Sequence, residues 1–151
     1  MTEEIILAGF GGQGILFAGK MLAYFGLMGG REVSWLPSYG PEMRGGTTNC
    51  SVCVSDTPIC SPLVTEPDIL IAMNKPSYDK FINTVKPGGI AIIDSFLIED
   101  RCVRDDIKCF YIPATPMAAE NCITGMANII LVGKLVKETG IASVATIKHA
   151  L

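Results

Sequence analysis

Charged residues are scarce in this chain. They make up 18% of its 151 residues, against about 25% in ordinary soluble domains. Hydrophobic residues make up 49%. A chain of this length forms one domain, which we expect over residues 1–151. A domain of this size has little room to bury apolar surface. The shortage of charge therefore suggests that a partner covers part of the surface. A compact monomer with an unusually large core is the alternative.

Three further absences exclude broad classes of function. The sequence has no basic run and a formal net charge of −3, so we do not expect it to bind nucleic acid. Residues 1–4 lack the basic start and cleavage region of a signal peptide. The apolar runs are too short, or too interrupted by glycine, to span a bilayer. These absences predict a cytoplasmic protein that is not bound to a membrane.

Residues that could ligate metal are few. The single histidine, His149, lies near the C-terminus with no apparent nucleophile to serve, so we expect it at the surface. Of the six cysteines, only Cys50 and Cys53 have the spacing of metal ligands. Both fall in an expected strand, where positions three apart face opposite sides. We interpret them as small buried hydrophobic residues and expect no metal site.

Strands and helices alternate along the chain. Short apolar runs that end in turn residues predict buried strands, and long stretches with little charge predict helices. Residues 15–28 have Lys20 as their only charge, so we expect this helix to be mostly buried. The strands are expected at residues 5–8, 32–36, 68–73, 90–93 and 108–112, and the helices at 15–28, 75–85 and 123–139.

Residues 47–55 alternate between two sets of side chains and predict a half-exposed strand. No helix fits between residues 36 and 47, so we expect this strand to run antiparallel to its neighbours. The fold class is therefore α/β: a three-layer α/β/α domain with a mostly parallel, mixed sheet, Rossmann-like.

In the last long helix, Gly125 and Gly133 would permit close approach of a neighbouring element. Gly140 would end that helix, and Ser143 would cap one more.

A glycine loop, Gly9-x-Gly11-x-x-Gly14, stands between the first strand and the first helix. It matches the dinucleotide-binding fingerprint, and its helix start offers free N–H groups to an anion. The second strand, however, ends at Pro37 without the acidic residue that holds a ribose, because Glu32 lies at its other end. A tight turn with no ligand, close approach by a partner, and an anionic ligand all remain open.

Loops that follow parallel strands collect at one edge of such a sheet. Arg44 would bring a planar cation to that edge, as an anion clamp, an intersubunit ion pair or a solvated arginine. Glu42 could hold the guanidinium when no ligand is present. The candidate residues for cofactor binding or a subunit interface are Gly9, Gly11, Gly12, Gln13, Gly14, Tyr39, Glu42, Arg44 and Asn49.

The glycine loop and the run Ser-Tyr-Gly-Pro-Glu-Met-Arg-Gly-Gly-Thr at residues 38–47 resemble the gamma subunit of 2-oxoacid:ferredoxin oxidoreductases. Residues 67–74 and 128–133 support the resemblance, which runs in order over nearly the whole chain. Residues 49–52 and 73–74 look closest to the 2-oxoglutarate and branched-chain members. Family members usually continue past the point that matches Leu151, so either the tail is cleaved, disordered or absent from this sequence, or this is a short member.

The resemblance implies an assembly in which alpha and beta subunits bind thiamine diphosphate and magnesium, with a ferredoxin-like delta subunit or domain. The assembly decarboxylates a 2-oxoacid, passes its acyl group to coenzyme A and sends two electrons through Fe–S clusters to ferredoxin. This chain has no diphosphate–magnesium motif and no ferredoxin-like cysteine run. We therefore expect a positioning subunit with no catalytic residue and no cofactor of its own, whose glycine-loop edge meets the thiamine-binding subunits near the entry of coenzyme A.

Two other functions remain open at this point. A stand-alone dinucleotide-binding oxidoreductase would hold NAD or FAD tightly. A stand-alone regulatory or ligand-binding module would be a stable monomer with no obligate partner.

Overall fold

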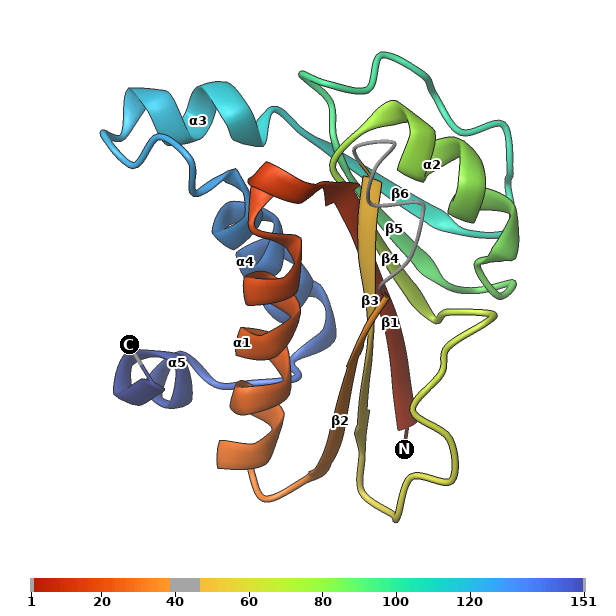
Figure 1. Ribbon diagram of the computed structural model, residues 1–151, viewed down its shortest axis with the longest axis vertical. Coiled ribbons are helices and arrows are strands. Elements are labelled where there is room, and N and C mark those ends of the chain that lie inside the picture. Colours follow the sequence, from red (N-terminus) through yellow and green to blue (C-terminus); the bar gives the residue numbers. More distant parts are fainter. Residues whose placement is uncertain (1, 39–46, 151) are drawn as a thin grey trace.

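The computed structural model describes residues 2–38 and 47–150 (Figure 1). The described strands form one six-stranded sheet in the order β2-β3-β1-β4-β5-β6. Strand β3 runs antiparallel to both of its neighbours, and the other pairs are parallel. The expected mixed sheet is confirmed. The strands are β1 (Thr2–Phe10), β2 (Glu32–Pro37), β3 (Thr47–Ser55), β4 (Ile69–Ala72), β5 (Ile90–Asp94) and β6 (Lys108–Ile112).

Helices cover both faces of this sheet. One face carries α1 and α4, with α5 outside them, and the opposite face carries α2 (Figure 1). Each layer has its own core, because the central strands β1 and β4 are apolar on both faces. The helices are α1 (Ile15–Met28), α2 (Lys75–Phe81), α3 (Ala114–Glu120), α4 (Ala127–Thr139) and α5 (Val144–Ala150), with short 3-10 helices η1 (Gly11–Gln13) and η3 (Ile82–Thr84). No helix in the described part of the chain is long and apolar enough to cross a membrane.

The expectation that residues 47–55 form a half-exposed strand is wrong. Strand β3 is buried on both faces from Cys50 onward. Cys50 packs in the core under α1, whereas Cys53 packs in the core on the α2 side. The segment after β3 folds back over its polar face, where the Ser51 hydroxyl accepts a hydrogen bond from the Val64 N–H at 3.2 Å. This long-range contact is what hides the face that the alternation marked as exposed.

The region before the last long helix also differs from its prediction. The sequence pattern predicts no helix between the strand that ends at residue 112 and the helix expected from residue 123, but α3 begins at Ala114, between two prolines. Proline is tolerated in the first turn of a helix because those N–H groups have no partner within it. Helix α4 accordingly starts at Ala127, with Gly125 in the preceding turn at φ +90°. Gly133 faces open space, so it permits no close approach.

The expectation of a mostly buried first helix is only half right. Seven of the fourteen residues of α1 are buried. The outward side exposes Phe17, Tyr24 and Leu27, each at half or more of its surface. The terminal signals of the later helices are confirmed: Gly140 closes α4 in the left-handed conformation, and the Ser143 hydroxyl accepts a hydrogen bond from the Thr146 N–H.

Candidate functional site

The ends of the strands bring most of the described candidate residues to one edge of the sheet. Phe10, at the end of β1, lies opposite Thr47 at the start of β3, and Ala8 lies opposite Asn49. The parallel strands β4, β5 and β6 end at the same side. We call this side the carboxyl edge; it comprises residues 10–14, 47–49, 73–75, 95–97 and 113–115. Tyr39, Glu42 and Arg44 lie outside the described residues.

Gln13 is fixed inside the chain. Its Oε1 accepts a hydrogen bond from the Phe10 N–H at 2.6 Å, and its Nε2 donates to the Met73 carbonyl at 3.0 Å. One amide therefore joins the ends of β1 and β4 and folds the glycine loop over the edge. Both polar atoms of the Gln13 side chain are hydrogen-bonded within the chain. Gln13 therefore shapes the loop that a ligand or partner would meet.

The glycines of the loop stand in different surroundings. A Cβ at Gly9 would lie 2.6 Å from Gln13 Oε1 and 2.9 Å from Ile15 Cδ1. Gly14 has φ +71°, and a Cβ there would lie 2.5 Å from Asn128 Nδ2. Gly11, by contrast, is exposed and has no atom within 4 Å of its Cβ position. Folding of the chain therefore requires glycine at positions 9 and 14 but gives no reason for glycine at position 11.

Asn128 is a site residue that the motif analysis did not single out. It is buried, and its Nδ2 donates to the Gly14 carbonyl at 3.0 Å. This bond ties the start of α4 to the start of α1. A signal was present in the sequence, since a lone amide before the apolar run at residues 129–132 has to find a hydrogen-bond partner when it is buried.

Two buried polar groups near the carboxyl edge have no hydrogen-bond partner. Asn74 caps α2, where its Oδ1 accepts from the Ser77 N–H at 2.9 Å, but its Nδ2 is unpaired. The Thr48 hydroxyl is unpaired as well, and only 4% of this residue is exposed. An unsatisfied buried polar group costs about 1–3 kcal/mol. A further hydrogen-bonding partner at either group would therefore stabilise the chain.

The buried carboxylate at the end of β5 is engaged inside the fold. Asp94 is fully buried. Its Oδ2 accepts from the Thr115 hydroxyl at 2.7 Å, and its Oδ1 accepts from the Phe96 N–H at 3.1 Å. Asp94 therefore holds the start of α3 and the turn after β5 in place.

The candidate residues at the edge divide between the two faces of the sheet. Asn49 lines a hollow of about 300 Å³ beside α2, together with Thr48 and Lys80. Gln13 lines a different, mostly apolar hollow of about 230 Å³ beside α3, with Met73 and Leu97. The structure thus gathers these residues at one edge but does not bring them into one pocket.

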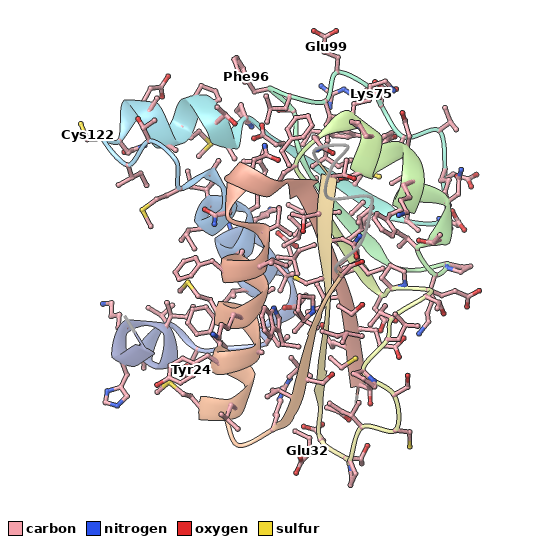
Figure 2. The ribbon with its side chains drawn as sticks, in the orientation of Figure 1. Tyr24, Glu32, Lys75, Phe96, Glu99 and Cys122 are labelled. Atoms are coloured by element: carbon pink, nitrogen blue, oxygen red, sulfur yellow. The ribbon has the colours of Figure 1, made fainter. Side chains whose placement is uncertain are left out.

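Two exposed aromatic side chains lie at the carboxyl edge, and one of them, Phe10, precedes Gly11 in the chain. Phe10 is 43% exposed and Phe96 is 59% exposed; Figure 2 shows Phe96 and Lys75 at this end of the molecule. Exposed aromatic residues next to an unobstructed glycine are typical of a surface that another chain covers.

The spaced cysteine pair does not form a metal site. Cys50 and Cys53 face opposite sides of β3, as predicted. Burial raises the pKa of the Cys50 thiol to about 12, so it stays protonated and is a poor ligand. Within residues 2–38 and 47–150, no group of three or more His, Cys, Asp or Glu side chains could hold a metal ion.

The family model described as pyruvate ferredoxin/flavodoxin oxidoreductase matches residues 4–151. The 2-oxoglutarate synthase subunit KorC of Methanocaldococcus jannaschii is 38% identical over 154 residues, covering 100% of this chain and 82% of the relative. The ketoisovalerate oxidoreductase subunit VorA of Methanothermobacter marburgensis is 40% identical over 130 residues, covering 86% of this chain but only 27% of the relative.

Solved structures show the same fold. The gamma subunit of a keto/oxoacid ferredoxin oxidoreductase from Geobacter sulfurreducens superposes with a TM-score of 0.88 at 29% identity, covering 99% of this chain and 83% of that one. A 2-oxoglutarate:ferredoxin oxidoreductase from Magnetococcus marinus, solved with 2-oxoglutarate, coenzyme A and succinyl-CoA, gives a TM-score of 0.86 at 25% identity, covering 98% of this chain and 26% of that one.

Proposed function

This chain belongs to the pyruvate ferredoxin/flavodoxin oxidoreductase family, and from that membership we propose that it is the gamma subunit of a 2-oxoacid:ferredoxin oxidoreductase. The observation that carries the proposal is the match along the whole chain to a gamma subunit of known structure, with a TM-score of 0.88. The partners are the alpha and beta subunits that bind thiamine diphosphate and magnesium, and a ferredoxin-like delta subunit or domain that carries Fe–S clusters.

The reaction of the assembly is the oxidative decarboxylation of a 2-oxoacid to an acyl-CoA and CO2, with ferredoxin as electron acceptor. Similarity to KorC over the whole chain favours 2-oxoglutarate, while similarity to VorA keeps a branched-chain 2-oxoacid as the second candidate. Thiamine diphosphate supplies the electron sink for decarboxylation. The part of this chain is to hold the other subunits in position.

The surface that we assign to the partner subunits is the carboxyl edge. Gly11 leaves room there for another backbone, and Phe10, Phe96 and Leu97 expose apolar area around it. The unpaired Asn74 Nδ2 and Thr48 hydroxyl offer hydrogen bonds close by. Coenzyme A reaches the active site next to this edge, and Arg44 and Glu42 belong to the same interface by their place in the sequence.

The sheet topology argues against a stand-alone dinucleotide-binding enzyme. In that fold the second strand lies beside the first and carries an acidic residue at its end. Here β3 separates β2 from β1, and β2 ends at Pro37. In a dinucleotide site the glycine loop binds the pyrophosphate, and the adjacent end of the second strand binds the ribose. In this chain the end of β2 is not adjacent to the glycine loop, so the two halves of such a site are not brought together.

The function is tested by purifying the tagged chain from its native host and identifying the proteins that accompany it by mass spectrometry. We expect thiamine-binding and ferredoxin-like subunits, and coenzyme A-dependent reduction of a viologen dye that is faster with 2-oxoglutarate than with 3-methyl-2-oxobutanoate. A lone monomer that holds NAD or FAD would overturn the assignment. A reversed order of the two substrates would overturn only the choice of 2-oxoacid.

The interface is tested by replacing Gly11 with leucine. The new side chain points into open space in the isolated chain, so the free energy of unfolding should change by less than about 0.5 kcal/mol. In a closed interface the same side chain overpacks and costs about 1–3 kcal/mol, so the subunit should be recovered less efficiently in pull-downs with its partners.

Gly133→Leu is the matched control, because Gly133 is also exposed with open space around it but lies on α4, away from the carboxyl edge. If the Gly11→Leu complex assembles as well as the wild type, the carboxyl edge is not part of the interface.

A further inference from the structure

A second group of reactive side chains lies far from the glycine loop in sequence, on the α2 side of the sheet. Residues 95–107 contain neither helix nor strand and lead into the edge strand β6. This segment carries Cys102, and β6 carries Cys109 seven residues later. Neither cysteine belongs to the surface described above.

The fold brings these two cysteines to one place. Cys109 and Tyr111 are two apart in β6 and therefore lie on the same face of the sheet. The Cys102 N–H donates to the Tyr111 hydroxyl at 2.8 Å, which places Cys102 over that face. Cys102, Cys109 and Tyr111 all pack against the core that contains Tyr78.

The two thiols and two phenols of this group interact with one another. Besides burial, Cys102 raises the pKa of the Cys109 thiol, so the two thiols are close enough to influence each other. Burial also raises the pKa of the Tyr78 phenol, and next Cys102, Tyr111 and Cys109 raise it further. Both cysteines are partly exposed, whereas Cys50 and Cys53 are buried and on opposite faces, and Cys60 and Cys122 are exposed. Cys102 and Cys109 thus combine a neighbouring thiol with access to a small solute.

We propose that Cys102 and Cys109 form a peroxide-sensitive dithiol that closes to a disulfide. Cys102 is assigned as the attacking residue, because it lies on a segment without regular structure, whereas the β5–β6 ladder holds Cys109 in place. Burial and the neighbouring Cys102 raise the pKa of Cys109 to about 11. Cys109 therefore has little thiolate near neutral pH and reacts slowly with peroxide, which leaves it as the second, resolving thiol.

The chemistry balances with hydrogen peroxide as the oxidant. The Cys102 thiol first loses its proton; its sulfur then attacks one peroxide oxygen, the O–O bond breaks, and the released hydroxide combines with that proton and leaves as water. The Cys109 sulfur then attacks the sulfenic sulfur of Cys102. The S–S bond forms, the S–O bond breaks, and the Cys109 proton leaves with the hydroxyl group as a second water. Two thiols and one peroxide give one disulfide and two waters, and a dithiol reductant reverses the change.

The closed form would join residues 95–107 covalently to the edge strand of the sheet. The same segment begins with Phe96 and Leu97 at the carboxyl edge, so oxidation would act on a segment that reaches that surface. The dithiol itself depends only on this chain and stands whether or not the proposed function is correct.

The test is peptide mapping of the full chain, in the complex with which it purifies, after reduction, brief exposure to hydrogen peroxide and alkylation. Trypsin cleaves after Arg101, Arg104, Lys108 and Lys134, so it separates the two cysteines. We expect peptide 102–104 linked to peptide 109–134, lighter by two hydrogen atoms than the two separate peptides, and released by dithiothreitol. Because peptide 109–134 also contains Cys122, the Cys122→Ser variant must give the same linked product.

Cys109→Ala provides a second measurement. Without the resolving thiol, the sulfenic acid on Cys102 should persist and be labelled by dimedone, and the linked peptide should be lost. The proposal is overturned if Cys102 and Cys109 remain separately alkylated at a peroxide dose that oxidises Cys60 and Cys122, or if Cys102 is linked to another cysteine instead. Should Cys109→Ala fail to fold, the linked peptide of the wild-type chain decides alone.

Discussion

At the scale of single residues, three glycines of one motif have different physical reasons to be glycine. Gly9 makes room for Gln13 and Ile15, and Gly14 adopts a positive φ against Asn128. Gly11 has neither constraint. A fingerprint that treats these positions alike therefore mixes two folding requirements with one position that the fold of the chain does not constrain. Of these three glycines, Gly11 is the one that can be changed without disturbing the isolated chain, which is why its substitution tests the interface.

Glu3 is a residue whose protonation should set part of the pH dependence of stability. Burial, and next the neighbouring Asp68, raise its pKa above the usual 4.5, and its Oε2 has no hydrogen-bond partner. The folded state therefore binds this proton more tightly than the unfolded state, and stability falls as the pH rises from 4.5 through the folded pKa. Glu3→Gln should unfold at a higher urea concentration than the wild type at pH 7 and at the same concentration at pH 4.

Glu4→Gln is the control for this prediction. Glu4 pairs with Lys86 at 3.0 Å, so neutralising it loses a partly exposed ion pair, worth about 0–1 kcal/mol. It should not stabilise the chain at pH 7. A Glu3→Gln variant that is no more stable than the wild type at pH 7 would show that the Glu3 carboxylate is well solvated.

At the scale of elements, the junction between α1 and α4 organises the carboxyl edge. The Gly14 carbonyl accepts hydrogen bonds from the Ala18 N–H at 3.0 Å and from Asn128 Nδ2 at 3.0 Å. The start of α1 is thus held both by its own first turn and by the buried amide of a helix more than a hundred residues away. This contact and the two hydrogen bonds of the Gln13 side chain hold the glycine loop against the ends of β1, β4 and α4.

Gly14→Ala should weaken this junction. A left-handed conformation costs a residue with a Cβ about 1–2 kcal/mol, and the added methyl group would also displace Asn128. We expect the free energy of unfolding, measured by urea titration, to fall by about 2 kcal/mol or more. Gly133→Ala, in the open middle of α4, should instead raise it by about 0.5–1 kcal/mol. Equal effects of the two changes would mean that α4 does not hold the start of α1.

At the scale of the whole molecule, the shortage of charge corresponds to apolar surface on the outside of α1. Phe17, Tyr24 and Leu27 are exposed by 56%, 50% and 58%, and Figure 2 shows Tyr24 on the side of α1 that faces α5. Clustered exposure of this kind marks a surface that associates. It adds a second apolar region to the one around the carboxyl edge.

Replacing Phe17 and Leu27 together with lysine should lower self-association of the isolated chain, as measured by sedimentation velocity. Because these side chains are largely in solvent, unfolding should change by less than about 0.5 kcal/mol per site. Val103→Lys is the control, since Val103 is 98% exposed but stands alone in a loop. If the wild-type chain sediments as a monomer at every concentration, α1 has no tendency to associate by itself.

The sequence by itself determined the strands and the direction of β3. The short apolar runs indicated strands. Too few residues separate β2 from β3 for the crossover helix that parallel neighbours need, so the two strands had to be antiparallel. Local chemistry also fixed the helix ends at Gly140 and Ser143, because a left-handed cap and a hydroxyl cap act within a few residues. The motifs at residues 9–14 and 38–47 indicated the family to which the chain belongs.

Only the tertiary structure decided which faces are covered and which polar groups are engaged. Residues 56–66 bury the second face of β3, and Asn128 meets Gly14 across the chain. Gln13 and Asn49 reach the same edge from opposite faces of the sheet, so the predicted surface is divided between two hollows. These outcomes depend on contacts between residues far apart in sequence, whose energies do not appear in any local pattern of polarity or spacing.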